Sequence, residues 1–265
     1  MAITTLDTLI GAPKINIPWY KTGTQTLVGG IPYTLVAVAG SPSSVAIAST
    51  NAANGALVTS SWVGYPSILP STGILYLSKV MYGGSVAATF TLYDKLFTAG
   101  TYQNTTAVAL SSQPTWSTRM PTTHYAELEL WVECAVASTG AENFSVTYTD
   151  GAGTVLTSTW VSGLTFAVGR CARFPLKSNY GIQILSSVTV YRSASSNTTD
   201  LGQFNFTILR PLYTGRVRTA NDGGTDDFLK TGLPQIYQES ALHVVYYADG
   251  TAVGLPYYFL EVASG

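Results

Sequence analysis

Hydrophobic and polar residues alternate with a period of two along much of this chain. Between positions 126 and 133 the even positions are apolar, and the odd positions carry Glu127, Glu129, Trp131 and Glu133. Such alternation is typical of a strand with one buried face and one face in water. Similar patterns predict strands over Ile74–Met81, Ala88–Tyr93, Phe144–Thr149, Thr154–Val161, Ile182–Arg192, Phe204–Leu209, Leu242–Ala248 and Tyr257–Val262.

Turn residues separate these predicted strands. Asp150-Gly151 and Asp249-Gly250 each favour a tight hairpin, because this dipeptide readily takes positive φ angles. The best helix candidate is the short stretch 225–230, with Thr225 as N-cap and Gly232 just after its end. Many short strands and very little helix predict an all-β fold, an antiparallel β-sandwich of the jelly-roll-like kind.

The N-terminal quarter of the chain has a different character. Its first 70 residues hold three charged residues, and their predicted strands, Tyr33–Val38 and Val45–Ala48, are short. We therefore expect residues 1–72 to form a low-charge extended arm with edge strands, which gains its order from a partner chain. Residues 73–265 would form the sandwich domain. Deleting residues 1–30 would then leave a folded domain that no longer assembles.

Charge is scarce throughout the 265 residues. Asp, Glu, Lys and Arg make up 10% of them, against roughly 25% in an ordinary globular domain. With 17 tyrosines and a net charge of −1, the surface is suited to lie against other protein. The chain has no basic excess for nucleic acid, no apolar run of ~18 residues for a membrane, and no signal-peptide pattern at its start.

The acidic residues offer two candidates for chemistry. Glu127, Glu129 and Glu133 share one predicted strand face, and their spacing of ~7 Å overlaps that of an inverting glycosidase. We favour a solvated strand face, since no cleft or matching acid is evident. The aspartates Asp222, Asp226 and Asp227 form a weak calcium candidate, for which we favour a loop that leads into a helix cap.

The remaining reactive residues give no catalytic pattern. The two histidines, His124 and His243, each precede a strand-like run, and no GxSxG sequence is present. Cys134 and Cys171 lack metal-ligand spacing, and we favour two separate buried thiols over a disulfide. We expect no enzyme activity and no cofactor. The four glycosylation sequons are read as chance matches; they begin at Asn104, Asn143, Asn197 and Asn205.

Clustered arginines are the best interface candidates, since the guanidinium group pairs with carboxylates and stacks on aromatic rings. Ordinary surface charge is the alternative. Two aromatic residues of the expected arm complete the set. The candidates are Arg170, Arg173, Arg210, Arg216, Arg218, Trp19 and Tyr20.

Four segments resemble a known group of proteins. They are Ile74-Leu-Tyr-Leu-Ser78, Thr91-Leu-Tyr-Asp-Lys-Leu96, Ala126-Glu-Leu-Glu-Leu-Trp-Val-Glu133 and Val146-Thr-Tyr-Thr-Asp-Gly-Ala-Gly-Thr154. In this order they are similar to structural proteins encoded beside the head genes of tailed bacteriophages. The resemblance covers roughly residues 73–212. This chain departs from the group by Lys95, where arginine is usual, and by a shortened hairpin at Asp150-Gly151.

The resemblance implies a virion component, specifically a capsid decoration (cement) or head-fibre protein, assembled in the bacterial host cytoplasm. Its implied partners are the major capsid protein and copies of itself, with a trimer as the expected homo-oligomer. The group offers no catalytic residues. The sequence lacks the long spine helix of a major capsid protein and the repeats of a fibre shaft, which favours a decoration protein.

Two other functions stay open. One is a carbohydrate-binding module of a tail fibre or baseplate, in which Trp116, Trp131 or Trp160 would stack on sugars. The other is a β-rich glycan depolymerase that uses the glutamate set.

Overall fold

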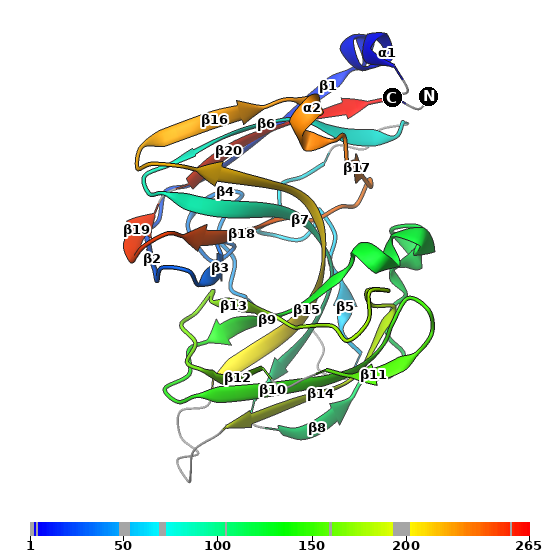
Figure 1. The fold of residues 1–265 in the computed structure, drawn as a ribbon, viewed down its shortest axis with the longest axis vertical. Coiled ribbons are helices and arrows are strands. Elements are labelled where there is room, and N and C mark those ends of the chain that lie inside the picture. The colour runs from blue at the N-terminus through cyan, green and yellow to red at the C-terminus, as the bar shows by residue number, and fades with distance from the viewer. Residues whose placement is uncertain are drawn as a thin grey trace. The chain divides into compact units, whose positions relative to one another are not determined.

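The protein is an all-β molecule in two compact units (Figure 1). The computed structural model describes residues 3, 5–47, 54–68, 73–103, 105–158, 161–192, 202–254 and 256–265. Unit 1 comprises Met1–Val45, Thr59–Asp94 and Leu212–Gly265, and unit 2 comprises Ala46–Val58 and Lys95–Pro211. Paired strands are antiparallel in both units, which confirms the predicted antiparallel β-sandwich class. Within the described part of the chain, no helix has the length and apolarity to cross a membrane.

Unit 1 is a sandwich of two sheets. One sheet has the order β16-β6-β20-β1-β4, with β17 also paired to β6. The other layer contains β3, β18 and the first part of β7, and a small β2–β19 ribbon lies apart. Two short helices, α1 and α2, complete the unit. The bounds are α1 Leu6–Gly11, β1 Lys14–Lys21, β2 Gln25–Leu27, β3 Pro32–Thr34, β4 Gly40–Ser41, β6 Leu75–Gly84, β7 Ala88–Tyr102, β16 Asp222–Asp226, α2 Phe228–Thr231, β17 Gln235–Ile236, β18 Leu242–Ala248, β19 Ala252–Gly254 and β20 Pro256–Ser264.

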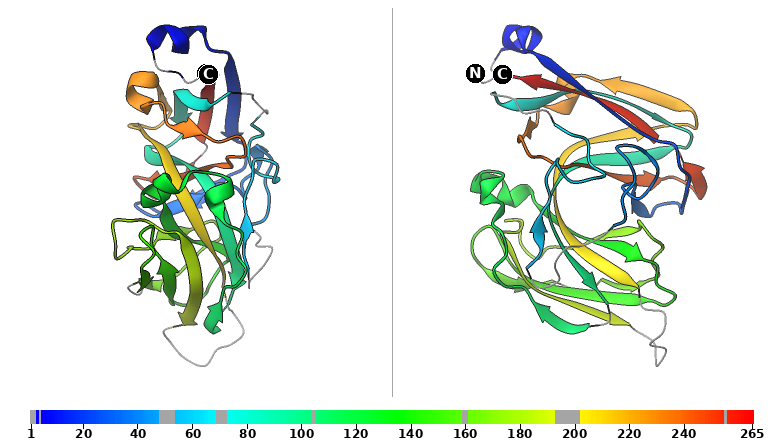
Figure 2. Two further views of the ribbon diagram at one scale, coloured as in Figure 1. Left: turned by 90° about the vertical axis from the view of Figure 1, so that its right-hand side faces the viewer. Right: turned by 180° about the vertical axis from the view of Figure 1, so that it is seen from behind.

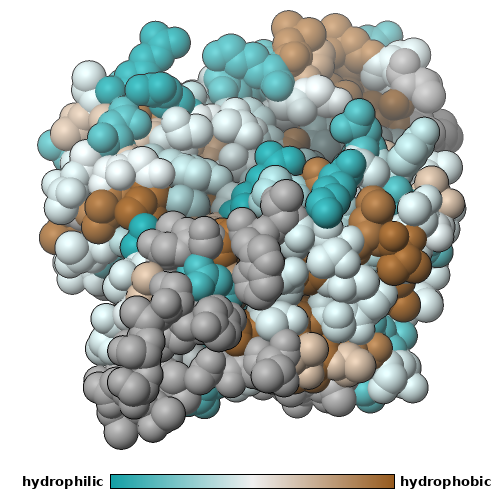
Figure 3. Space-filling model, turned by 60° about the horizontal axis from the view of Figure 1, so that its bottom comes forward, coloured by the Kyte–Doolittle hydropathy of each residue, from teal (hydrophilic) through white to brown (hydrophobic). Residues whose placement is uncertain are grey.

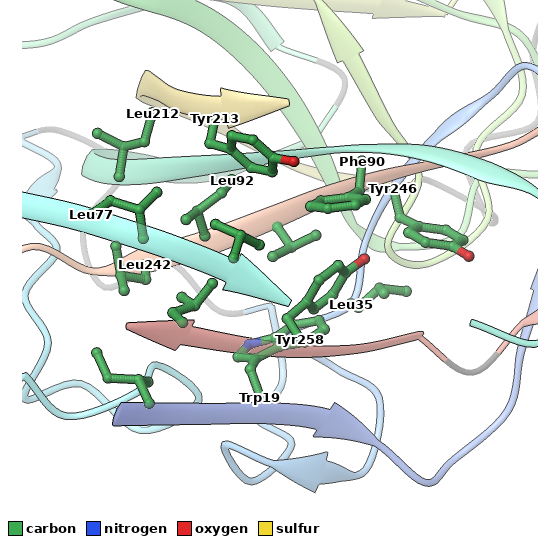
Figure 4. Close-up of a cluster of buried hydrophobic side chains, with 14 of the residues drawn as sticks. Trp19, Leu35, Leu77, Phe90, Leu92, Leu212, Tyr213, Leu242, Tyr246 and Tyr258 are labelled. Carbon is green, nitrogen blue, oxygen red and sulfur yellow. The ribbon is translucent and has the colours of Figure 1, made fainter. Parts of the chain in front are cut away.

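The core of unit 1 is rich in aromatic side chains from both sheets (Figure 4). Trp19 of β1 packs on Tyr258 of β20 with 4.8 Å between ring centroids. Tyr258 in turn meets Phe90 of the facing sheet at 4.6 Å. Tilted ring pairs at these distances add to the stabilisation that burial alone provides, so the two sheets are joined through this aromatic stack.

Unit 2 is a second sandwich (Figure 2). One sheet has the order β11-β10-β14-β8, with β12 also paired to β10, and it faces a layer of β13, β9 and the first part of β15. Phe144 of β10 lies at the centre of its core, 4.8 Å from Phe204 and 5.5 Å from Phe166 between ring centroids. The bounds are β5 Ala56–Leu57, β8 Thr105–Ala109, η1 Trp116–Thr118, η2 Thr122–Glu127, β9 Glu129–Val136, β10 Glu142–Thr149, β11 Val155–Thr157, β12 Val161–Leu164, β13 Cys171–Arg173, β14 Ile184–Arg192 and β15 Gln203–Val217.

The first 72 residues do not form a separate arm. Strand β1 pairs with β20 from Lys14 to Tyr20 and with β4 on its other side, and its Ile17 and Trp19 are buried in the core. The expected boundary at residue 72 coincides with neither unit, since unit 1 takes chain from both expected regions. The low charge of these residues therefore does not indicate lack of structure. Deleting residues 1–30 would remove a strand that covers this core.

The local turn predictions had mixed outcomes. The Asp150-Gly151 hairpin is confirmed, because β10 pairs with β11 and Asp150 Oδ1 accepts hydrogen bonds from the following loop amides. The prediction of a hairpin at Asp249-Gly250 is wrong, because the chain after it forms β19, which pairs with β2 instead of β18. The segment Val45–Ile47 forms no strand, and Ala48 lies outside the described residues.

The predicted helix is shorter than expected. It begins at Phe228, and its N-cap is Asp227, whose side chain accepts a hydrogen bond from the Leu229 amide. Thr225 cannot serve as the cap because it belongs to strand β16. Gly232 ends the helix with a φ of 70°, as its position in the sequence indicated.

Candidate interaction surface

The solvent-facing side of the β16-β6-β20-β1 sheet carries an apolar patch, here called the outer face. Side chains that are direct cross-strand partners lie on the same side of a sheet. Two rows of partners therefore cross this face. One row joins Gly223, Gly83, Tyr257 and Tyr20, and the next joins Thr225, Met81, Phe259 and Pro18.

Glycines shape the centre of the outer face. A Cβ atom at Gly83 would lie 2.2 Å from the Tyr257 hydroxyl oxygen, and one at Gly223 would lie 3.1 Å from it. The Tyr257 ring therefore extends across the backbone of β6 toward β16, where only glycine leaves room. One side of the ring is covered by the sheet, and the outer face is flat at this point.

The outer face exposes four large apolar side chains to solvent. The exposed fractions are 47% for Tyr20, 53% for Tyr257, 36% for Phe259 and 42% for Met81. Since aromatic side chains have roughly 150–250 Å² each, the three rings together leave roughly 200–350 Å² open. Patches of a few hundred Å² on a monomer commonly mark interaction sites. Aromatic residues and methionine are also the types enriched in protein–protein interfaces.

Charges on the outer face neutralise one another. Lys79 Nζ lies 3.5 Å from Glu261 Oε2, and Ser78 donates a hydrogen bond of 2.9 Å to the other carboxylate oxygen. At the β1 edge a groove of about 450 Å³ adjoins the face, and Pro18 and Val63 are among its lining residues. A neutral apolar partner surface with a protruding side chain would fit this arrangement.

Apolar residues are more dispersed on the face of the molecule that Figure 3 shows. On the face drawn in Figure 3 they form several separate patches between polar residues. Single exposed hydrophobic residues are common on soluble proteins and need no partner. The aligned rows of the outer face are therefore the stronger candidate for recognition.

The structure separates the two aromatic interface candidates of the N-terminal region. Tyr20 lies on the outer face, as an interface residue should. The prediction that Trp19 is an interface residue is wrong, because its side chain points into the core against Tyr258 and is buried. Lys21 Nζ lies 5.2 Å from the Trp19 ring centroid, and burial lowers the pKa of Lys21 to about 8. Adjacent strand residues face opposite sides, so only one of the pair could be exposed.

The candidate arginines were expected in two groups, 170 with 173 and 210 with 216 and 218, and the second group is divided between the units. Arg170, Arg173 and Arg210 belong to unit 2, and Arg216 and Arg218 belong to unit 1. The prediction that Arg210 is an interface residue is wrong. Arg210 is buried, and its Nε donates a hydrogen bond to Glu127 Oε2 at 2.7 Å. Arg170 donates to the Thr165 carbonyl and lies over the Phe166 ring.

Two of the arginines are mostly exposed and form ion pairs at the surface. Arg173 lies 3.1 Å from Glu129, with 62% of its side chain exposed, and Arg216 lies 2.9 Å from Asp249, with 60% exposed. Arg218 is also exposed. Exposed pairs of this kind contribute little to stability, so these residues stay available for a partner.

The aspartate cluster does not form a calcium loop. Asp222 and Asp226 lie at the two ends of the extended strand β16, and Asp227 caps α2. Asp226 is buried and accepts hydrogen bonds from Tyr213 and Lys230. Burial raises the pKa of Asp226, but these two donors outweigh it and hold the pKa below its ordinary value. In the described ranges no three His, Cys, Asp or Glu residues gather closely enough to hold a metal ion.

The glutamate set is divided between different environments. Glu127 lies on η2 rather than in a strand, and Glu129 accepts a 2.9 Å hydrogen bond from Trp131 Nε1. Glu133 is buried, with 2% of its side chain exposed, and pairs with Lys95 Nζ at 2.6 Å. The expected solvated face of this strand is therefore wrong for Glu133, because unit 2 packs against both sides of β9.

The sequence did not reveal the Lys95–Glu133 pair. Lys95 is 5% exposed and belongs to the Leu92-Tyr-Asp-Lys-Leu96 segment, while Glu133 ends the Leu128–Glu133 segment. Two of the segments that resemble phage proteins thus meet at one buried ion pair. The available indication of this pair was a basic residue at position 95 and an acidic residue at position 133, because a buried charge needs a partner of opposite charge.

The pKa of Glu127 is lowered in the folded protein. Partial burial raises this pKa, but hydrogen bonds from His124 and Arg210 outweigh burial. We expect the stabilising contribution of Glu127 to be present above its unfolded-state pKa of about 4.3 and to be lost as the pH falls through the folded-state pKa. Urea midpoints of the wild type and Glu127→Gln, compared from pH 7 downward, should converge only in acid. A gap that stays constant down to full protonation would contradict this assignment.

The two cysteines are free and buried. Cys171 is the cross-strand partner of Glu133, so Cys134, the next residue along β9, faces the opposite side of the sheet. A disulfide would need both on one side, and the preference for separate thiols is therefore supported. Burial, with Glu133 nearby, raises the pKa of Cys134 to about 12. We expect Ellman's reagent to label neither thiol in the native protein and both after unfolding in guanidinium; rapid native labelling would contradict this.

The remaining candidate residues from the sequence are buried, are bonded within the protein or lie outside the described residues. Trp116 and Trp131 are buried and cannot stack on a sugar, while Trp160 lies outside the described residues. Of the sequons, Asn143 and Asn205 are buried, and Asn104 and Asn197 lie outside the described residues. His243 is buried, and His124 bonds Glu127 at 2.6 Å.

Comparisons with known proteins leave the family open. No family model and no curated protein matches the chain. Among solved structures, the T13 viral particle of infectious bursal disease virus aligns over 96% of this chain and 78% of its own, with 8% identity and a TM-score of 0.21. The Gx strain of that virus aligns over 96% and 41%, with 10% identity and a TM-score of 0.19, so this chain spans less than half of that one. Likeness this weak carries no argument about function.

Proposed function

We propose that this chain is a structural component of a bacteriophage virion, and specifically a capsid decoration protein. In this role it binds the lattice of the major capsid protein and copies of itself, as a trimer, and stabilises the head. The observation that carries the proposal is the outer face, where Tyr20, Met81, Tyr257 and Phe259 are exposed in neighbouring strands. An apolar, internally neutral face gains free energy when it is covered by another protein.

The chemistry of the molecule supports a binding role over a catalytic one. A glycosidase needs one carboxylic acid that holds its proton near neutral pH. The pKa of Glu127 is lowered instead, and Glu133 is buried against Lys95. We infer that the glutamate set does not hydrolyse glycans.

The segments that resemble head-associated phage proteins support the virion assignment. In this chain they are strand and turn segments of both units, and two of them are joined through the buried Lys95–Glu133 pair. Residues of this kind define a fold rather than a binding specificity, so the resemblance supports the class of protein and the outer face supports the contact with a partner.

Purified protein and heads assembled without it provide the direct test. We expect saturable co-sedimentation at micromolar protein, and heads that resist heat longer once the protein is bound. Quantitative mass spectrometry of virions should find many more copies than a fibre, collar or baseplate protein has. Absence of binding at micromolar concentration, or a low copy number, would rule out the decoration role.

A further inference from the structure

Unit 2 has an open cleft whose lining differs in character from the outer face. The cleft has a volume of about 620 Å³ and lies between the η2–β9 junction and the segment 173–181. This volume falls in the range of roughly 300–1,000 Å³ that is typical of small-molecule sites. Glu127, Glu129 and Arg173 supply charged groups, while Pro175 and Leu176 supply an apolar wall.

Protein donors hold both carboxylates of the cleft in place. Glu127 receives hydrogen bonds from His124 at Oε1 and from Arg210 at Oε2. Glu129 receives a hydrogen bond from Trp131 at Oε2 and an ion pair from Arg173 at Oε1. A carboxylate oxygen has two lone pairs. Both carboxylates are therefore oriented by protein groups, and the Glu127 carboxylate, which is 43% exposed, can still accept a hydrogen bond from a ligand.

The opposite wall is also fixed. Gly181 has a φ of 64°, and a Cβ there would lie 1.8 Å from the Tyr125 carbonyl oxygen, so the segment packs closely against the end of η2. Three further hydrogen bonds tether the segment, from the Phe174 amide to the Leu130 carbonyl, from the Lys177 amide to the Tyr148 hydroxyl, and from the Gly151 amide to the Tyr180 carbonyl. A ligand would enter a preformed site and would not have to order it.

Charge balance determines which ligand fits. Glu127 and Glu129 are paired with Arg210 and Arg173, so the negative and positive charges at the cleft cancel. Neither a metal cation nor an anion gains a net attraction there. The exposed groups are the Glu127 carboxylate, the remaining donors of Arg173 and the side chain of Asn179.

We propose that this cleft binds a neutral saccharide. Sugar hydroxyls would donate to the exposed carboxylate of Glu127 and accept from Arg173, and the C–H face of the ring would lie on Pro175 and Leu176. A polypeptide carries fewer neutral hydroxyl donors than a saccharide does. The apolar outer face suits a protein partner better than this cleft does. The site places glycan recognition in unit 2, on side chains other than the tryptophans that the sequence suggested, and it is independent of the decoration role.

A glycan array of neutral oligosaccharides from bacterial, plant and animal sources, probed with the full chain, tests the proposal. Titration calorimetry then measures the strongest binder against Arg173→Ala and Asn179→Ala. We expect Arg173→Ala to weaken binding by about 10–100-fold, because it removes hydrogen bonds from a charged group. Asn179→Ala removes hydrogen bonds from a neutral amide and should weaken binding by about 3–10-fold.

The matched control is Arg216→Ala, which removes an equally exposed, ion-paired arginine from unit 1. It should bind like the wild type, and thermal unfolding should show all three variants folded. A wild-type chain that binds no glycan at millimolar concentration would overturn the proposal. Binding that is unchanged in both cleft variants, or capture of peptides instead of glycans, would also overturn it. Binding to phage heads is a separate measurement that these variants should not alter.

Discussion

Replacing Glu133 by alanine is expected to lower the free energy of unfolding by about 3–5 kcal/mol, because it leaves the ammonium group of Lys95 buried without its partner. Both side chains are almost fully buried, at 5% and 2% exposure, and their charged atoms are 2.6 Å apart. Urea unfolding followed by circular dichroism measures the change. Glu239→Ala is the control, since Glu239 is an exposed glutamate, and it should change stability by less than about 0.5 kcal/mol.

A double variant separates the pair from general damage to the core. Lys95→Met combined with Glu133→Leu removes both charges and keeps apolar volume, and it should recover most of the stability that Glu133→Ala loses. Arginine at position 95, the residue usual in the resembling proteins, should keep the pair. If the double variant is no more stable than Glu133→Ala, the buried charge of Lys95 is not the cause of the loss.

Changing Tyr257 and Phe259 together to serine is expected to weaken binding to phage heads by about 100-fold or more, while the protein stays folded. Aromatic hot spots at the centre of an interface typically lose about 2 kcal/mol or more on truncation, and about 1.4 kcal/mol corresponds to a tenfold change. Both side chains project from β20 to solvent, so their removal leaves the unit 1 core intact. Co-sedimentation with heads over a range of protein concentrations measures the affinity.

The control for this experiment is Val155→Ser. Val155 is an exposed hydrophobic residue on β11 of unit 2, outside the outer face. This variant should bind heads like the wild type. The urea midpoints of Val155→Ser and the wild type should agree within experimental error. Equal binding by the Tyr257 and Phe259 double variant would mean that the outer face does not contact the head.

Period-two patterns predicted where strands run better than which face they bury. The strands around Leu242–Ala248 and Tyr257–Val262 were located correctly. In β20, however, exposed Tyr257 and Phe259 alternate with buried Tyr258 and Leu260. All four are apolar, so alternation gave no indication of the outward side. Composition alone suggested a surface made for contact with protein, without locating it.

Long-range packing explains the errors that remained. Glu133 looked solvated because its strand alternates, but its surroundings depend on Lys95, which is 38 positions away in the sequence. Trp19 looked like part of an arm because few charges surround it, but β20, at the other end of the chain, covers it. Neither partner can be identified from a local window. The cleft was missed for the same reason, since it needs the 173–181 segment to return to the start of β9.

The position of β20 has a consequence for synthesis in the cell. The outer face combines residues from β1 with residues from β20, which is translated after β1 and after every strand between them. During translation β1 therefore lacks this neighbour until β20 has left the ribosome, because a chain is made from its N-terminus. Nascent chains that have not reached β20 cannot present the completed face, so they are unable to dock through it.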